Sequence, residues 1–262
     1  RITPDRVAKY GLDPASTPVL RHHMNAKELV RGGEEHWVID FYGLTAEQAR
    51  AEYPALFQHV LDHVKPERDA NKDRGFRERW WVFGRPRPDM RSAIVGLSRY
   101  IITPETAKHR FFVFSDLKLM PDHKLYAICT DDAYVLGVLN SNHSLKWALS
   151  AGGTLEDRPT WTNTTCFDPF PFPDANDAQK ARIRELAEHL DAHRKQVQAA
   201  HPDATLTGMY NALQRAREAT AGGAALAEKE RQFHDRALIG VLRSIHDDLD
   251  AAVADAYGCP RT

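Results

Sequence analysis

Positively charged and aromatic side chains gather in one stretch of the sequence, residues 65–110. This stretch holds twelve Lys and Arg against six Asp and Glu, a net charge of +6 in a chain whose overall charge is −1. Such side chains neutralise phosphates, release counterions and can donate to guanine in the major groove. The alternative is a solvated face with internal ion pairs, because KPERD and RERWW interleave both signs. The cations that we expect to contact nucleic acid here are Lys65, Arg68, Lys72, Arg77, Arg79, Arg85 and Arg87.

A second set of residues imitates a metal-dependent nuclease site. Pro88-Asp89, followed by Asp116-Leu117-Lys118, is similar to an arrangement in which two carboxylates hold Mg²⁺ and a lysine orients the nucleophile. Asp89 is expected to open a helix, whereas such sites usually set the first acid at a hairpin or strand end. A magnesium nuclease using Asp89, Asp116 and Lys118 therefore stays open as an alternative.

Other catalytic and cofactor patterns are missing from the sequence. It has no G-x-G-x-x-G, Walker or G-x-S-x-G motif. The pairs His59/His63 and His189/His193 have helical i,i+4 spacing, but neither is followed by a convincing third metal ligand. Asp168-Pro-Phe-Pro departs from the D/N-P-P-Y/F motif of amino-methyltransferases at its third and fourth positions. We predict no catalytic residue, no metal site and no cofactor site in this chain.

The elements that must position these residues fall into three zones. Residues 1–30 look like a lead-in or connector, 31–173 mix short strands and helices, and 174–262 carry helical stripes after FDPFPFP. The predicted fold class is α+β, a mixed α/β region followed by an all-helical C-terminal bundle. The stripes also leave a helical protein-interaction module as an alternative function.

Individual elements follow from local patterns. In the mixed zone we expect a helix over 45–64 with a Thr45–Gln48 capping box, and short helices near 89–96 and 132–141. The helical zone predicts helices over 177–200, from 207 onward and over 238–256. The segments expected to be extended are HWVIDF (36–41), RERWWVF, RYIIT, RFFVF and KLYAICT.

Composition bounds the class of protein. The 262 residues are 42% hydrophobic and 27% charged, which is ordinary for a globular protein and argues against disorder. No apolar run is long enough to span a membrane, and the polar N-terminus is unlike a secretory signal. Three cysteines without a C-x-x-C pair favour a reducing compartment. The first residue is not Met, which suggests an excised fragment.

Several long runs together resemble one known family, the MmeI-like DNA adenine methyltransferases, in the C-terminal half of those enzymes. The runs are HWVIDFYGL (36–44), HVKPERDANKDRGFRERWWVFGRPRP (63–88), GLSRYIITPETAKHRFFVF (96–114), DDAYVLGVLNSNHSLKWAL (131–149), NTTCFDPFPFP (163–173) and LTGMYNALQRAR (206–217), with NAKELV (25–30) similar to the connecting segment. Family members are single-chain modification or restriction–modification enzymes of bacteria, and a cytoplasmic location is expected.

The resemblance implies a target-recognition domain over 31–173 and a helical domain over 174–262. Double-stranded DNA would be the partner, together with an upstream domain of the same polypeptide. That domain would bind S-adenosylmethionine, carry the N-P-P-Y motif and methylate adenine N6, so the chain alone is not expected to be an enzyme. The family reads bases from the segment after the strand matching RYIIT, which is PETAKHR here. The residues carried over by position are Glu105, Thr106, Lys108, His109 and Arg110, with Arg158 a weaker candidate.

Overall fold

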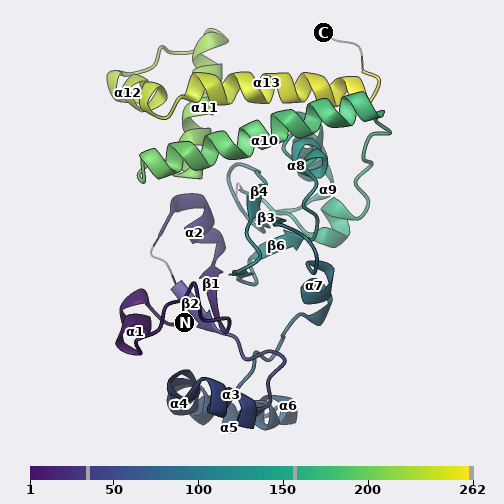
Figure 1. Ribbon diagram of the computed structural model, residues 1–262. Helices are drawn as coiled ribbons and strands as arrows, with labels where there is room; N and C mark the ends of the chain where they lie inside the picture. The colour runs from purple at the N-terminus through teal and green to yellow at the C-terminus, as the bar shows by residue number, and fades with distance from the viewer. Residues whose placement is uncertain (34–35, 156–157, 260–262) are drawn as a thin grey trace. The chain divides into compact units, whose positions relative to one another are not determined.

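A computed structural model describes residues 1–33, 36–155 and 158–259 (Figure 1). The chain divides into two compact units. The first unit comprises Arg1–Met24, Glu34–Val95 and Lys118–Met120, and the second comprises Asn25–Gly33, Gly96–Leu117 and Pro121–Thr262. Helices and small sheets occur together, which confirms the predicted α+β class. Within the described ranges, every helix is too short or too polar to cross a lipid bilayer.

The first unit joins a small sheet to a group of short helices. Its sheet has the order β2-β1-β5, and β1 and β2 pair antiparallel with Leu20 opposite Ile39. Buried side chains from the N-terminal segment, among them Ile2, Val7 and Leu20, share one core with Phe41 and Leu56. Residues at the start of the chain, expected to be a lead-in, therefore contribute to this core. The elements of this unit are α1 (Pro4–Lys9), β1 (Leu20–Met24), β2 (His36–Ile39), α3 (Ala46–Glu52), α4 (Pro54–His63), α5 (Lys65–Asp69), α6 (Arg74–Glu78), α7 (Pro88–Ala93) and β5 (Leu119–Pro121).

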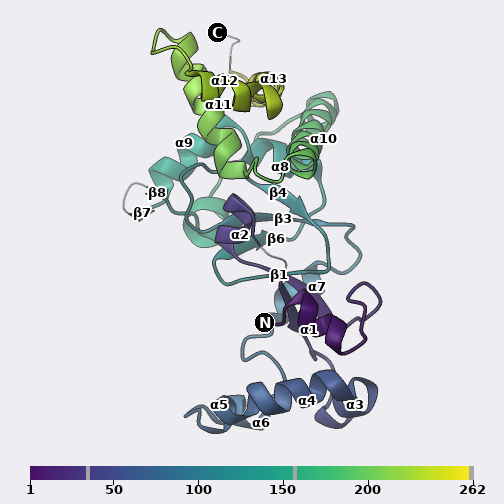
Figure 2. The ribbon, with the colours of Figure 1, turned by 90° about the vertical axis from the view of Figure 1, so that its left-hand side faces the viewer.

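The helix expected over 45–64 is two helices, α3 and α4 (Figure 2). Its start is confirmed, because the Gln48 amide donates to Thr45 Oγ1 at 3.2 Å and the Thr45 amide donates to Gln48 Oε1 at 2.9 Å. The break falls at Pro54, which has no N–H to continue α3 and instead occupies the first position of α4.

The extended segment expected at RERWWVF was wrong, because α6 and a turn take its place. The helix forms since Asp73 caps it, accepting from the Gly75 amide at 2.7 Å. The two tryptophans then pack against the unit's interior. The Trp80 ring lies 5.3 Å from Phe57, and Trp81 Nε1 donates to the Leu44 carbonyl at 3.0 Å. The apolar residues Trp80, Trp81 and Val82 therefore form a packed turn. No alternation of apolar and polar residues within the segment distinguishes this turn from a strand.

The second unit surrounds an antiparallel sheet of order β4-β3-β6. Its central strand is buried at all five positions, with Ile101 opposite both Phe114 and Ile128. The sheet strands are β3 (Tyr100–Pro104), β4 (Val113–Ser115) and β6 (Leu125–Ile128). The other elements are α2 (Ala26–Arg31), α8 (Ala133–Leu139), α9 (Asn142–Ala151), β7 (Thr154–Leu155), β8 (Arg158–Pro159), a π-helical turn (Asn163–Phe167), α10 (Asp177–Ala200), α11 (Leu206–Thr220), α12 (Glu228–Arg236) and α13 (Ile239–Ala256).

The helices of the second unit pack along the stripes expected from the sequence. The long helix α10 lies beside α13 and also contacts α8 (Figure 1). Its predicted bounds are confirmed, and Asn176 and Gln179 form the capping box that starts it. At Gly137 of α8 a side chain would come within 2.6 Å of Ile183 Cγ2, so the close approach of α8 to α10 requires glycine there. The domain boundaries at residues 30 and 173 remain predictions.

Candidate nucleic-acid interface

The segment predicted to read bases is the 104–110 loop, which follows β3 in the second unit. Backbone hydrogen bonds fix its first residues on two sides. The Glu105 amide donates to the Lys124 carbonyl at 2.9 Å, and the Trp161 amide donates to the Glu105 carbonyl at 2.7 Å. Thr106 forms a β-bridge with Thr160. The loop therefore leaves the sheet in a fixed direction.

Arg110 lies inside this loop and holds its shape. The residue is only 8% exposed, and its guanidinium donates to the carbonyls of Pro104, Glu105 and Pro159 and to Thr103 Oγ1. Burial lowers the pKa of Arg110 to about 10, so the group stays charged at neutral pH. A buried cation needs such acceptors to replace water. The guanidinium is thus engaged within the loop and its neighbour β8.

The two preceding candidates, Lys108 and His109, meet one residue of α11. Lys108 is exposed and His109 is half-buried. Lys108 Nζ lies 2.7 Å and His109 Nε2 lies 2.9 Å from the same atom, Asn211 Oδ1. Burial lowers the pKa of His109, the bond to Asn211 opposes that shift, and the charge of Lys108 adds to it. The ring of Tyr210 lies 6.0 Å from that of His109 at an interplanar angle of 32°.

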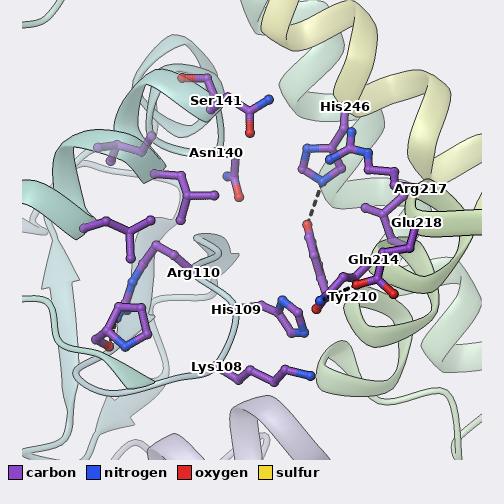
Figure 3. A pocket seen from close by; sticks show the side chains of 16 residues that line it. Lys108, His109, Arg110, Asn140, Ser141, Tyr210, Gln214, Arg217, Glu218 and His246 are labelled. Atoms are coloured by element: carbon purple, nitrogen blue, oxygen red, sulfur yellow. Dashed lines mark hydrogen bonds between the residues drawn. The ribbon is translucent and has the colours of Figure 1, made fainter. Parts of the chain in front are cut away.

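Lys108, His109 and Arg110 line one wall of a cavity of about 380 Å³ in the second unit (Figure 3). The opposite wall comes from α11 and α13, including Gln214, Arg217 and His246. The leucines of α8 and α9 contribute apolar surface. The cavity is therefore polar where the loop meets α11 and apolar toward the helices behind it.

A buried polar network supports the α11 wall. The Tyr210 hydroxyl lies 2.8 Å from His246 Nε2 and also contacts the guanidinium of Arg194. Arg194 is 1% exposed and donates to the Phe112 carbonyl and to Asn140 Oδ1. Burial lowers the pKa of Arg194 to about 9 and that of His246 well below its usual range. The network links α10, α11 and α13 to the segment that follows the loop and to the end of α8.

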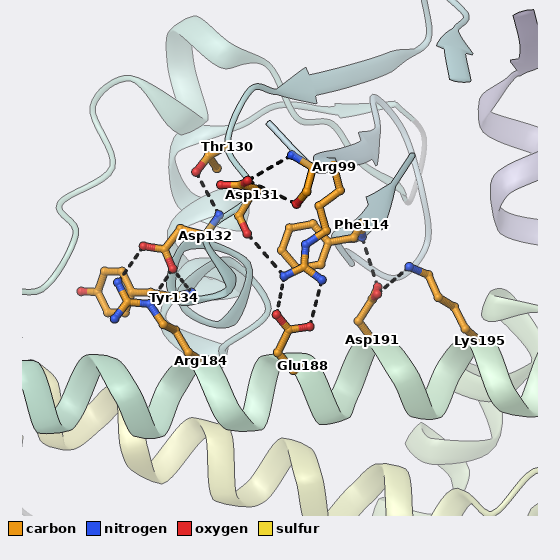
Figure 4. Close-up of polar contacts among 11 residues, drawn as sticks. Arg99, Phe114, Thr130, Asp131, Asp132, Tyr134, Arg184, Glu188, Asp191 and Lys195 are labelled. Atoms are coloured by element: carbon orange, nitrogen blue, oxygen red, sulfur yellow. Dashed lines mark hydrogen bonds and ion pairs between the residues drawn. The ribbon is translucent and has the colours of Figure 1, made fainter. Parts of the chain in front are cut away.

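A second polar network attaches α10 to the sheet (Figure 4). Arg99, just before β3, pairs with Glu188 and donates to the Asp131 carbonyl. Asp191 accepts from the Phe114 amide at 3.1 Å. Arg184 pairs with Asp132, the N-cap of α8, and this contact lowers the pKa of Asp132. The edge strand β4, the start of β3 and the segment that follows β6 are thereby connected to α10.

The remaining candidates of the second unit have weaker positions for reading bases. Glu105 forms an ion pair with Lys124 at 2.7 Å, and its side chain is 25% exposed. Thr106 is half-buried. Arg158 is exposed in β8.

The basic segment of the first unit, residues 65–95, divides into cations with partners and cations without. Lys65 pairs with Asp69 and lies 5.8 Å from the Trp80 ring. Arg68 stacks over Phe76 at 4.5 Å, and Arg77 donates to two backbone carbonyls of its own turn. The expected internal pairing is therefore present, but only for part of the set.

Four further cations of this segment are exposed and have a different setting. Lys72, Arg79, Arg85 and Arg87 have no side-chain hydrogen bond or ion pair with any part of the chain that the structure describes. The turn that carries Arg85 and Arg87 is itself fixed, because Arg91 Nε donates to the Pro86 carbonyl at 2.6 Å. Arg91 in turn pairs at 2.8 Å with Asp40, whose side chain is 5% exposed. The free cations thus project from an anchored backbone.

The residues of the nuclease alternative are not gathered in one unit. Asp89 belongs to the first unit and Asp116 to the second. Lys118 Nζ donates to the Ala15 carbonyl at 3.1 Å. In the residues that the structure describes, no group of three or more His, Cys, Asp or Glu is placed to hold a metal ion. No observation here favours this alternative.

Comparison with known proteins decides the family. The family model described as the MmeI target recognition domain matches residues 4–174 of this chain. The chain belongs to that family. The match spans the strand β3, the 104–110 loop and the basic segment, and so confirms the resemblance drawn from the sequence runs.

Two known proteins are similar to this chain over the helical region as well. DNA methyltransferase A of Bacillus subtilis (strain 168) is 22% identical over 261 residues, which cover 94% of this chain and 27% of that protein. The type IIL restriction-modification enzyme MmeI, solved in complex with DNA, superposes with a TM-score of 0.68 and 19% identity. That match covers 100% of this chain and 31% of the enzyme's chain. The chain thus spans under a third of each relative's length.

Sequence reasoning missed the residues that position the loop. Asn211 and Tyr210 lie in the run LTGMYNALQRAR, but nothing in their spacing points to a contact about 100 residues earlier. Arg194 and His246 occupy buried helix positions where hydrophobic residues are usual. The one available signal was that Arg194 and His246 fall on the apolar faces of their helices, where a polar side chain needs buried partners.

Proposed function

We propose that this chain recognises a specific sequence of double-stranded DNA as the target recognition domain of a restriction–modification enzyme. Support comes from the family match over residues 4–174 together with exposed cations inside that range. The MmeI enzyme was solved in complex with DNA, and its fold covers this whole chain. The observation that carries the proposal is that the chain holds both an anchored loop, 104–110, and exposed cations that lack partners among the described residues.

The two regions have different chemical tasks in this proposal. Lys72, Arg79, Arg85 and Arg87 contact phosphates, which gives affinity without sequence information. Lys108 and His109 meet base edges, because they stand on a loop fixed by backbone hydrogen bonds. Arg110 acts as a positioning residue, since its two terminal nitrogens already donate to carbonyls of the loop and of β8.

We propose further that the parent enzyme methylates adenine N6. S-adenosylmethionine would bind an upstream domain of the same polypeptide and supply the methyl group. This chain's own residues hold the duplex in register for that domain. No step of the transfer is assigned to a residue described here.

The test is a titration of the purified chain with fluorescent duplex DNA at several salt concentrations. Binding with a log–log salt slope of roughly −0.9 per phosphate contact is expected. The Arg85→Ala variant is expected to reduce the magnitude of that slope by about one and to weaken binding to all DNA sequences equally. The matched control is Arg182→Ala on α10, an exposed arginine that pairs with Glu185. Binding that is absent, or independent of salt, would overturn the proposal.

A further inference from the structure

The contact between the 104–110 loop and α11 fixes the positions of hydrogens as well as of heavy atoms. Asn211 Oδ1 lies within hydrogen-bond distance of Lys108 Nζ and His109 Nε2. A lysine ammonium can only donate, so the atom facing it must be the amide oxygen and not the amide nitrogen. Since that same oxygen can only accept, His109 Nε2 must carry a hydrogen.

The other ring nitrogen of His109 then has a determined role. In a neutral imidazole one nitrogen donates and the other accepts. Burial lowers the pKa of His109, and with the adjacent Lys108 charge it outweighs the opposing hydrogen bond to Asn211, so the ring is neutral at pH 7.5. Nδ1 therefore carries a free lone pair, and among the described residues it has no hydrogen-bond partner.

We infer that Asn211 is a specificity-determining positioning residue, which sets His109 as a hydrogen-bond acceptor beside the donor Lys108. This inference rests on the proposed function. In the major groove an acceptor matches the exocyclic amino group of adenine N6 or cytosine N4, and a neighbouring donor matches purine N7 or guanine O6. The class of ligand is thus an amino-bearing base edge. Tyr210, packed between His109 and the buried network of His246 and Arg194, sets the plane of the ring.

The arrangement gives a reason for the contact between α11 of the helical region and the 104–110 loop. Asn211 belongs to α11, outside the range that the family model matches. A residue that never meets DNA would thereby decide which base the loop accepts. Transferring the 104–110 loop of this chain into another protein without α11 would separate His109 from Asn211, the residue that fixes its tautomer.

The first test reads the tautomer directly, without DNA. In the full chain labelled with ¹⁵N-histidine, His109 is assigned by its loss in His109→Gln. The expected spectrum shows a protonated Nε2 and an unprotonated Nδ1 at pH 7.5. In Asn211→Ala this preference is lost, whereas Gln214→Ala, one turn along α11 and bonded to Glu218, leaves it unchanged. A protonated Nδ1 in the wild-type chain would overturn the inference.

The second test reads the base. Selection from a randomised duplex library defines the preferred sequence, and His109→Ala identifies the position whose preference is lost. Replacing the adenine or cytosine of that pair by an analogue without its amino group should weaken wild-type binding about tenfold and leave His109→Ala binding unchanged. Asn211→Ala should lose the same preference. Equal binding of the analogue by the wild-type chain would overturn the assignment.

The outcomes separate this inference from the proposed function. A wild-type chain that binds no duplex DNA overturns the proposed function and the base contact together, while the tautomer spectrum still decides the role of Asn211. A chain that binds DNA with an unchanged preference in Asn211→Ala overturns the inference alone. Thermal unfolding of Asn211→Ala checks that this variant is folded.

Discussion

The 104–110 loop and the basic segment 65–95 carry the same kind of side chain in opposite settings. In the loop, Lys108, His109 and Arg110 each have hydrogen-bond partners supplied by other elements. In the basic segment, Arg85 and Arg87 are exposed and have none among the described residues. One region uses its polar groups to fix geometry, and the other leaves them available.

In the proposed function, this difference separates the residues that give specificity from those that give affinity. A base contact discriminates only where the donor or acceptor is held in place, because the wrong base must then leave a polar group unpaired. A phosphate contact needs charge and access, and a mobile side chain supplies both. The comparison predicts that substitutions in the two regions have effects of different kinds.

The largest expected effect comes from removing the four exposed cations of the basic segment that lack partners among the described residues. The variant with Lys72, Arg79, Arg85 and Arg87 changed to Ala should bind every duplex roughly a thousandfold more weakly at low salt, with a salt slope smaller by about four. Its preference among sequences should persist at the reduced affinity. Titrations at three salt concentrations measure this, and a loss confined to one sequence would refute the division of tasks.

The next effect is on stability, at Arg110. Replacing it by Met leaves the carbonyls of Pro104, Glu105 and Pro159 without their donor inside the unit. We expect the free energy of unfolding to fall by about 3 kcal/mol, because several buried acceptors lose a charged partner. Urea unfolding measures it, with Arg158→Met, an exposed neighbour, as the control. A change below about 1 kcal/mol would mean that Arg110 is not the loop's internal support.

A smaller effect follows pH through His246. Burial holds the pKa of His246 in the folded chain well below the ordinary value near 6.5. Below pH 6.5 the unfolded chain therefore binds a proton at this residue, whereas the folded chain does not. Stability is therefore complete above that pH and falls as the pH drops, by at most about 1.4 kcal/mol per unit for this group. Urea midpoints at pH 7.5, 6.5 and 5.5 should decline less steeply in His246→Gln. Parallel curves for the two proteins would contradict this explanation.

The smallest expected effect is at Arg77. Its guanidinium already donates to the carbonyls of Asn71 and Lys72, at 2.7 and 3.0 Å. Arg77→Ala should weaken DNA binding by less than about twofold, since phosphate competes there with bonds already made. Comparison with Arg79→Ala, whose side chain has no such partner in the described chain, tests this directly. Equal losses would show that internal hydrogen bonds do not limit availability.

The sequence predicted the helical region better than the 104–110 loop for a physical reason. Helices such as α10 and α13 bury a stripe at helical spacing, and this stripe is visible locally. The break at Pro54 was also visible locally, yet periodicity across it concealed two helices. In contrast, the roles of Arg110 and Asn211 depend on carbonyls and side chains brought together by the tertiary fold. No local pattern distinguishes a buried arginine from one that faces DNA.

The most direct measurement compares His109→Gln with Arg85→Ala in one binding assay on the selected duplex and a scrambled duplex. If the loop reads bases, His109→Gln lowers the ratio of specific to nonspecific affinity about tenfold with the salt slope unchanged. If the basic segment meets phosphates, Arg85→Ala leaves the ratio unchanged and reduces the slope by about one. If both variants change the ratio, or both change only the slope, the two regions do not divide recognition and the central claim fails.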